Sequence, residues 1–184
     1  MKFNPSRLYF TPCACLRVKH VFIALVISAV ALVGWQAQAA TFTYNQNTAT
    51  AQSWNASANW NPSSGTYPNN AGDVADLNNN ITNNSTLNLN GNVTLGILNI
   101  GDTDDTNTFT IAAGAGGTLT MNNNGAGAQI NESAGTKGDT ISAGIIIADA
   151  GGLTVTTSAT SSTLSSNSPL ANPARAAASR AGWS

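Results

Sequence analysis

The sequence predicts an all-β fold: a right-handed parallel β-helix, or solenoid, with an aromatic cap at its N-terminal end. The first observation is a set of apolar pairs, spaced by one residue, with centres near residues 88, 99, 110, 120, 130, 141 and 154. Spacing by one residue puts both side chains on one face of a strand. The second is that Asn, Gly and Thr separate these pairs, as turn residues separate short strands. The third is that residues 81–157 contain no proline and few charges, which suits a stack of parallel strands.

The spacing also predicts the size of a turn. Two repeat units of ten or eleven residues give a turn of about 22 residues, and residues 81–157 then supply three to four turns. A β-sandwich is the alternative, because strands spaced by 8–12 residues are typical of that fold too. A low-complexity disordered tract is the third interpretation, and the recurring apolar pairs argue against it.

Residues 1–39 have the features of a secretory signal peptide. Basic residues precede an uninterrupted apolar run, Val21 to Val33, and Ala37 and Ala39 provide small side chains at the −3 and −1 positions of a cleavage site. Thirteen apolar residues are too few to span a bilayer, which needs about 20. We therefore expect a protein secreted by a bacterium or displayed on its surface, cleaved near Ala39, with no transmembrane span afterwards.

Cleavage at that point changes the chemistry available to the chain. Cys13, Cys15 and His20 all leave with the signal peptide, so no disulfide, Cys/His zinc site or His-dependent nucleophile is expected in the mature chain. Three Lys or Arg and eight Asp or Glu remain, which gives a net charge of −5. A surface of that charge does not attract phosphate backbones, so nucleic acid is excluded as a partner.

Residues 40–80 form an aromatic segment that we interpret as the cap of the solenoid. A covered first turn is needed because an open end would be an adhesive strand edge. The segment contains Trp54, Trp60 and Tyr67. The alternative is that these three side chains are exposed and stack on sugars, which would make the protein a carbohydrate-binding module.

Residues 81–164 contain the predicted strand repeats. Within them, Gly96 separates two alternating segments, which predicts a bend at that position. Asparagines on neighbouring parallel strands are expected to form ladders along the axis. Residues 165–184 are rich in Ala, Pro and Arg and lack the alternation, so we expect a disordered or truncated tail.

The chain from Trp54 to Leu164 resembles the N-terminal part of the autotransporter-associated β-strand repeat proteins. The motifs that carry the resemblance are WNASANW at 54–60, LNGNVTLG at 89–96, LNIGD at 98–102, GTLTM at 117–121 and GDTISA at 138–143. The resemblance implies a right-handed parallel β-helix of passenger type, displayed outside the cell. It also implies that the chain is one portion of a longer kind of protein.

Asp102, Asp104 and Asp105 form the densest acidic cluster of the chain. Carboxylates on a turn can bind calcium, which prefers hard oxygen ligands. The sequence lacks the glycine at position six and the distal glutamate of an EF-hand loop. The two interpretations are a solvated turn without any cofactor and a calcium site at these three residues.

Paired carboxylates can also hydrolyse glycosidic bonds when they face each other across a groove. Asp73 with Asp76 and Asp139 with Asp149 are the candidate pairs, but Lys137 is the one cation of the strand repeats. A β-helix enzyme that degrades polysaccharides is therefore the second alternative. We expect a protein that is not an enzyme: an exported adhesive scaffold or stalk whose partner is an extracellular glycan or another cell-surface molecule.

Overall fold

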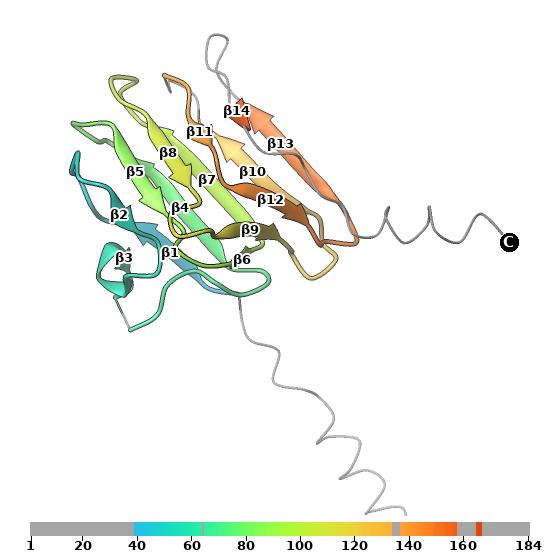
Figure 1. The fold of residues 1–184 in the computed structure, drawn as a ribbon. Coiled ribbons are helices and arrows are strands. Elements are labelled where there is room, and N and C mark those ends of the chain that lie inside the picture. The colour runs from blue at the N-terminus through green and yellow to red at the C-terminus, as the bar shows by residue number, and fades with distance from the viewer. Residues whose placement is uncertain (1–38, 64, 134–136, 158–164, 167–184) are drawn as a thin grey trace, which may run out of the picture. The chain divides into compact units, whose positions relative to one another are not determined.

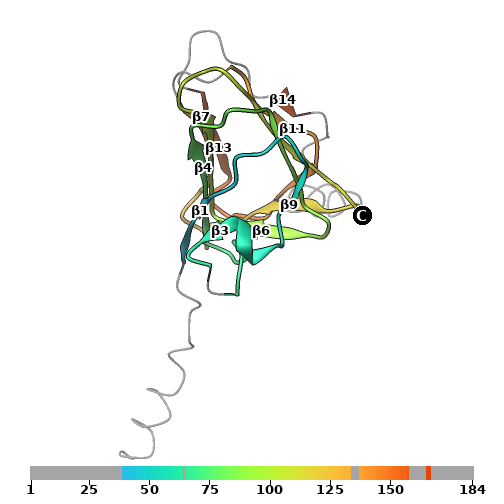
Figure 2. The same cartoon turned by 90° about the vertical axis from the view of Figure 1, so that its left-hand side faces the viewer.

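The computed structural model describes residues 39–63, 65–133, 137–157 and 165–166, and these form a parallel β-solenoid (Figure 1). Figure 2 shows the strands arranged as the three sides of a triangle. The first sheet has six strands in the order β13-β10-β7-β4-β1-β3, the second has five in the order β14-β11-β8-β5-β2, and the third has three in the order β12-β9-β6. Because parallel neighbours in each sheet are three positions apart in the chain, every three strands complete one turn; β3, which pairs antiparallel with β1, is the exception.

Three complete turns lie between two partial ones. The first partial turn holds β1 (Thr41–Tyr44) and β2 (Gln52–Ser53), followed by the 3-10 helix η1 (Ser57–Asn59) and β3 (Trp60–Asn61). The complete turns are β4 (Val74–Asn79), β5 (Ser85–Asn88), β6 (Val93–Leu95); β7 (Ile97–Asp102), β8 (Phe109–Ala112), β9 (Thr118–Met121); and β10 (Ala128–Glu132), β11 (Thr140–Ile141), β12 (Gly144–Ile147). The last partial turn holds β13 (Leu153–Thr157) and β14 (Ser165–Ser166).

The prediction of an all-β solenoid is confirmed, and the alternative of a β-sandwich is wrong because the stacked strands run parallel. The predicted turn of about 22 residues agrees with one turn and is too short for the next. In the first sheet Val74 pairs with Ile97 and Ile97 with Gln129, so successive turns advance by 23 and 32 residues. The difference lies at the corners: Gly96 alone joins β6 to β7, whereas residues 122–127 join β9 to β10.

The interior is built from columns of inward-facing side chains. The recurring apolar pairs supply these columns because register places each pair above the corresponding pair of the preceding turn. Typical columns are Ala75–Leu98–Ile130 in the first sheet, Leu87–Ile111–Ile141 in the second and Val93–Leu119–Ile145 in the third. All nine side chains are buried. On the outer face, Asn131 Nδ2 donates to Asn99 Oδ1 at 3.1 Å, which confirms that asparagines form a ladder between turns.

The N-terminal end of the stack is closed by an aromatic cluster and an antiparallel strand. β3 pairs with β1 on the side opposite β4, so the first sheet ends in an antiparallel edge. The rings of Trp54 and Trp60 lie 4.7 Å apart, and Tyr44 makes edge-on contacts with Trp60 and Phe109. Each indole nitrogen donates to a buried carbonyl: Trp54 to Pro68 at 2.9 Å and Trp60 to Trp54 at 2.7 Å. The cap interpretation is confirmed.

The predicted division at residues 40–80 and 81–164 needs refinement. β1, β2 and β4 lie within the aromatic segment, yet they pair in parallel with later strands and belong to the solenoid itself. At the other end, β14 pairs with β11, so the stack continues just beyond residue 164. Of the predicted signal peptide at 1–39 and the predicted tail at 165–184, residues 1–38 and 167–184 lie outside the described residues.

Glycine pairs stack at the corners, where successive turns approach most closely. A Cβ added to Gly96 would lie 2.7 Å from the Cα of Gly72, and one added to Gly117 would lie 2.2 Å from the carbonyl oxygen of Gly91. A Cβ added to Gly151 would meet the backbone nitrogen of Gly127 at 2.7 Å. Backbone occupies these positions, so a side chain there cannot be accommodated by a change of rotamer.

Gly96→Ala should therefore destabilise the solenoid by about 1–3 kcal/mol, the usual cost of overpacking a well-packed site. Gly91→Ala is the matched control, because a Cβ on Gly91 would meet no atom within 4 Å. The control should change the free energy of unfolding by less than about 0.5 kcal/mol. Urea denaturation of the two variants measures this difference. Equal effects would show that the corner at Gly96 relaxes to admit a methyl group.

Candidate functional site

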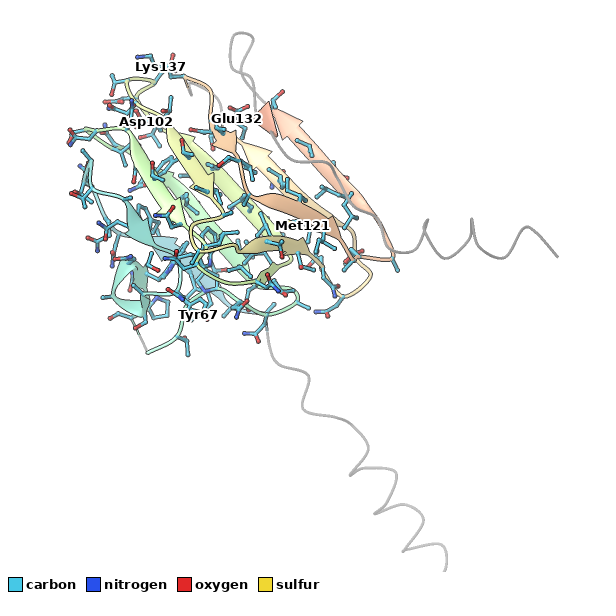
Figure 3. The ribbon with its side chains drawn as sticks, viewed as in Figure 1. Tyr67, Asp102, Met121, Glu132 and Lys137 are labelled. Atoms are coloured by element: carbon cyan, nitrogen blue, oxygen red, sulfur yellow. The ribbon has the colours of Figure 1, made fainter. Side chains whose placement is uncertain are left out.

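The aromatic residues predicted as a sugar platform are packed inside the cap. Trp54 and Trp60 are 0% exposed, and their faces contact each other and the core. The premise of exposed tryptophans is therefore corrected: closing the end of the stack buries both rings. Tyr67 is half-buried beside the cap and packs against the same core (Figure 3). The structure thus places the three residues together, but as parts of the cap and its edge.

Asp102 organises the loop that follows β7. Its Oδ1 accepts the backbone N–H of Ile81 from the preceding turn at 3.0 Å. Its Oδ2 accepts the backbone N–H groups of Thr106 at 3.0 Å and Asn107 at 2.7 Å. Burial raises the pKa of Asp102, but the hydrogen bonds from Ile81, Asn107 and their neighbours outweigh burial, and the pKa lies below its ordinary value. The carboxylate is a buried cap for backbone donors.

The other two acids of the predicted calcium site face solvent. Asp104 accepts hydrogen bonds from Thr106 and from Asn80 Nδ2, and Asp105 is exposed with a φ of 60°. Within the described ranges, no group of three or more Asp, Glu, His or Cys side chains is arranged to hold a metal ion. This geometry fits the solvated-turn interpretation, and calcium binding at Asp102, Asp104 and Asp105 stays a prediction.

Asp73 and Asp149 cap the corner between the third and first sheets. Asp73 precedes β4 and accepts the backbone N–H groups of Ala40, Asn69 and Asn70 at 2.9–3.1 Å. Asp149 precedes β13 and accepts four backbone N–H groups, from Asn123, Gly125, Gly127 and Gly151. Three of those four come from the preceding turn, so this side chain joins one turn to the next.

The hydrogen bonds to Asp149 favour its ionised form. Burial raises the pKa of Asp149, but the backbone N–H groups of Asn123, Gly151, Gly125 and Gly127 together outweigh burial, and the pKa lies below its ordinary value. Hydrogen bonds from backbone N–H to a carboxylate are among the stronger ones in proteins. Asp149 therefore stabilises the stack as an anion.

A second kind of acidic environment lies at the corner between the first and second sheets. Glu132 ends β10 and pairs with Ile100 of β7, so its side chain occupies a core column formed by Leu77 and Ile100. Asp139 precedes β11, and its backbone N–H donates to Glu132 Oε1 at 3.2 Å. Both acids are 1% exposed. Figure 3 shows Glu132 near Asp102 and Lys137, at the same edge of the solenoid.

The carboxylate of Asp139 accepts few hydrogen bonds. Its Oδ1 accepts the backbone N–H of Phe109 at 2.7 Å, but its Oδ2 has no hydrogen-bond partner among the described residues. The pKa of Asp139 is raised to about 6: burial raises it most, the hydrogen bond from Phe109 lowers it in part, and the charges of Glu132 and Asp102 raise it. The third turn thus buries a carboxylate that is costly to ionise.

The candidate pairs for glycoside hydrolysis are separated by the fold. Asp73 is buried at a corner, whereas Asp76 lies on β4 and accepts the backbone N–H of Asn78. Asp139 precedes β11 and Asp149 follows β12, so they serve different corners. The pair that the structure does bring together, Glu132 with Asp139, was not anticipated, although Glu132 occupies an inward position of the alternating run Ala128, Ile130, Glu132.

Comparison of the chain with protein-family models, curated proteins and solved structures returned no match. The described residues contain no helix that is long and apolar enough to cross a membrane.

Asp149→Asn should destabilise the protein by about 1–3 kcal/mol at pH 7, because the amide group must point at backbone donors and leave them unsatisfied. The difference between the variant and the wild type should vanish in acid, because the pKa of Asp149 is lower in the folded state than in the unfolded chain. Asp149 contributes its full share to the free energy of unfolding above the ordinary pKa of 3.8. This share is lost as pH falls through the folded pKa. Urea titrations at pH 3 to 7 measure it. Asp105→Asn, which makes the same charge change at an exposed position, should be neutral; equal losses would contradict the assignment.

Asp139→Asn should have the opposite effect and stabilise the protein at pH 7. A pKa raised from 3.8 to about 6 means that the folded state holds a proton more tightly than the unfolded chain. The stabilisation that Asp139 gives to the folded state by holding this proton is complete below about pH 4 and is lost as pH rises to about 6. Above that pH, the buried ionised carboxylate lowers the free energy of unfolding by about 3 kcal/mol. Asparagine retains the oxygen that accepts from Phe109 and removes the charge. Unfolding free energies from pH 4 to 8 should therefore fall less steeply in the variant; an unchanged slope would refute the prediction.

Proposed function

We propose that this protein is an exported structural module, a rigid β-solenoid that serves as a stalk or adhesive scaffold at a bacterial surface. The observation that carries the proposal is how the structure uses its polar groups. Asp73, Asp102 and Asp149, each buried, accept backbone N–H groups that close the corners of the stack. Acids committed in this way maintain the scaffold and are not free to bind a substrate.

The outer faces of the sheets support the same function. Along each strand, the outward-facing residues alternate with the inward-facing residues of the core columns. The outward-facing residues are mostly Thr and Asn, as in the stacked set Thr86, Thr110 and Thr140 on the second sheet. Such faces are polar, weakly charged and repetitive along the axis. A repetitive polar surface suits a spacer or a weak, multivalent contact with glycans or other cell-surface molecules.

The features of residues 1–39 support export. An exported chain without cysteine must be stable without disulfides. Hydrogen-bonded turns and filled core columns provide that stability here. The resemblance to autotransporter-associated β-strand repeat proteins agrees with this role, and the burial of Trp54 and Trp60 removes the main support for a sugar-stacking module.

Export is tested by expressing the full chain with a C-terminal epitope tag in a Gram-negative host. We expect the protein outside the cytoplasm, with an intact mass that corresponds to cleavage after Ala39. Ala39→Phe is the matched control, because a bulky residue at the −1 position should block cleavage and cause the precursor to accumulate. Antibody labelling of whole cells then reports surface display. An uncleaved wild-type chain that stays in the cytoplasm would contradict the proposal.

A further inference from the structure

The predicted cleavage point lies immediately before the first described residue that packs against the core of the solenoid. Ala39 is exposed, whereas Ala40 is half-buried and packs against the core. The carbonyl oxygen of Ala40 accepts the backbone N–H of Val74 at 2.8 Å, immediately before β1 pairs with β4. Cleavage after Ala39 would therefore remove chain up to the solenoid without removing any residue of β1.

The nitrogen that cleavage would expose already faces a buried acid. The backbone nitrogen of Ala40 donates to Asp73 Oδ1 at 3.0 Å. Asp73 is 1% exposed, and its Oδ2 accepts from Asn69 and Asn70. Each of these partners is a neutral N–H donor, so in the uncleaved chain the Asp73 carboxylate is hydrogen-bonded but has no opposite charge among the partners described.

We propose that removal of the signal peptide creates a buried ion pair between the new α-ammonium group of Ala40 and the Asp73 carboxylate. The inference rests on the proposed function, because it requires cleavage after Ala39. Hydrolysis of the Ala39–Ala40 peptide bond adds one water: Ala39 retains the new carboxylate, and the nitrogen of Ala40 becomes an amine that is protonated at neutral pH. The same nitrogen then presents a positive charge where it previously presented a neutral N–H.

The consequence is that processing stabilises the fold. The hydrogen bond to Asp73 is charge-assisted before cleavage, because its acceptor is a carboxylate. Cleavage adds a positive charge on the donor, and the attraction between the two opposite charges then acts in a geometry that the backbone of β1 and β4 already fixes. Asp73 also joins two turns, because its carbonyl oxygen accepts the N–H groups of Gly96 and Ile97 at 2.9 and 3.1 Å. An ion pair at Asp73 would thus act on the corner through which the first complete turn leads into the second. The mature protein should be more stable than any form whose Ala40 nitrogen is acylated.

Selective acetylation of the α-amine tests this inference on the processed protein. Lys137 is the one lysine beyond residue 39, so in Lys137→Arg the α-amine of Ala40 is the sole primary amine of the mature chain. The full chain of this variant is exported and processed, its N-terminus is confirmed by intact mass, and unfolding is compared before and after acetylation. We expect acetylation to raise the unfolding equilibrium constant at pH 7 roughly tenfold or more.

Two further comparisons separate the ion pair from a general effect of acetylation. In Lys137→Arg with Asp73→Asn, acetylation should have little effect, because no carboxylate faces the amine. In the Asp73 protein, the difference between free and acetylated forms should be complete below about pH 8, the ordinary pKa of an α-amine, and should disappear as pH rises through the raised pKa of the paired amine. This second comparison remains decisive if Asp73→Asn does not fold.

The outcomes distinguish the inference from the function on which it rests. A protein that is exported and cleaved after Ala39, but whose stability does not respond to acetylation, overturns the ion pair and leaves the proposed function standing. Cleavage at another position also overturns the ion pair alone. A chain that is neither exported nor cleaved overturns both.

Discussion

The structure depends on how backbone N–H groups are satisfied at the corners of the solenoid. Within each sheet, parallel strands exchange hydrogen bonds from turn to turn, but at the corners some backbone N–H groups lie outside this ladder. Buried backbone donors without partners are costly, so these N–H groups need another acceptor. Asp73, Asp102 and Asp149 supply carboxylates that reach the N–H groups of the preceding turn. The acids that give residues 40–184 their negative charge are therefore partly structural.

The same constraint explains why the corners are rich in glycine. Parallel strands in neighbouring turns lie about 4.8 Å apart, and a sharp corner brings their backbones into direct contact. At Gly96 and Gly117 there is no room for a Cβ against the turn below. The longer corner of residues 122–127 keeps such a contact, between Gly127 and Gly151, and it contains more N–H groups outside the ladder, three of which donate to the carboxylate of Asp149. Corner length and corner chemistry are thus linked.

The strands could be predicted from the sequence because an inward position repeats every second residue and is apolar in most turns. Leu98 with Ile100 and Leu119 with Met121 show this requirement plainly, and both pairs are buried in the expected strands. The length of a turn could not be predicted, because corners of one residue and of six connect equivalent strands. The cap interpretation anticipated the burial of Trp54 and Trp60, but the sequence left the exposed alternative open, since a tryptophan in a loop is exposed or buried according to how the loop folds over the core.

The candidate site was harder to predict because carboxylates that look alike in sequence differ in what surrounds them. Asp149 and Asp139 both lie in turns between short strands, but four backbone N–H groups surround Asp149, whereas Asp139 faces Glu132 in the interior. The first arrangement lowers a pKa and the second raises one. Acid therefore weakens one corner and strengthens the other. The pKa values of Asp149 and Asp139 move in opposite directions because backbone N–H groups surround the first carboxylate, whereas burial beside another acid dominates at the second.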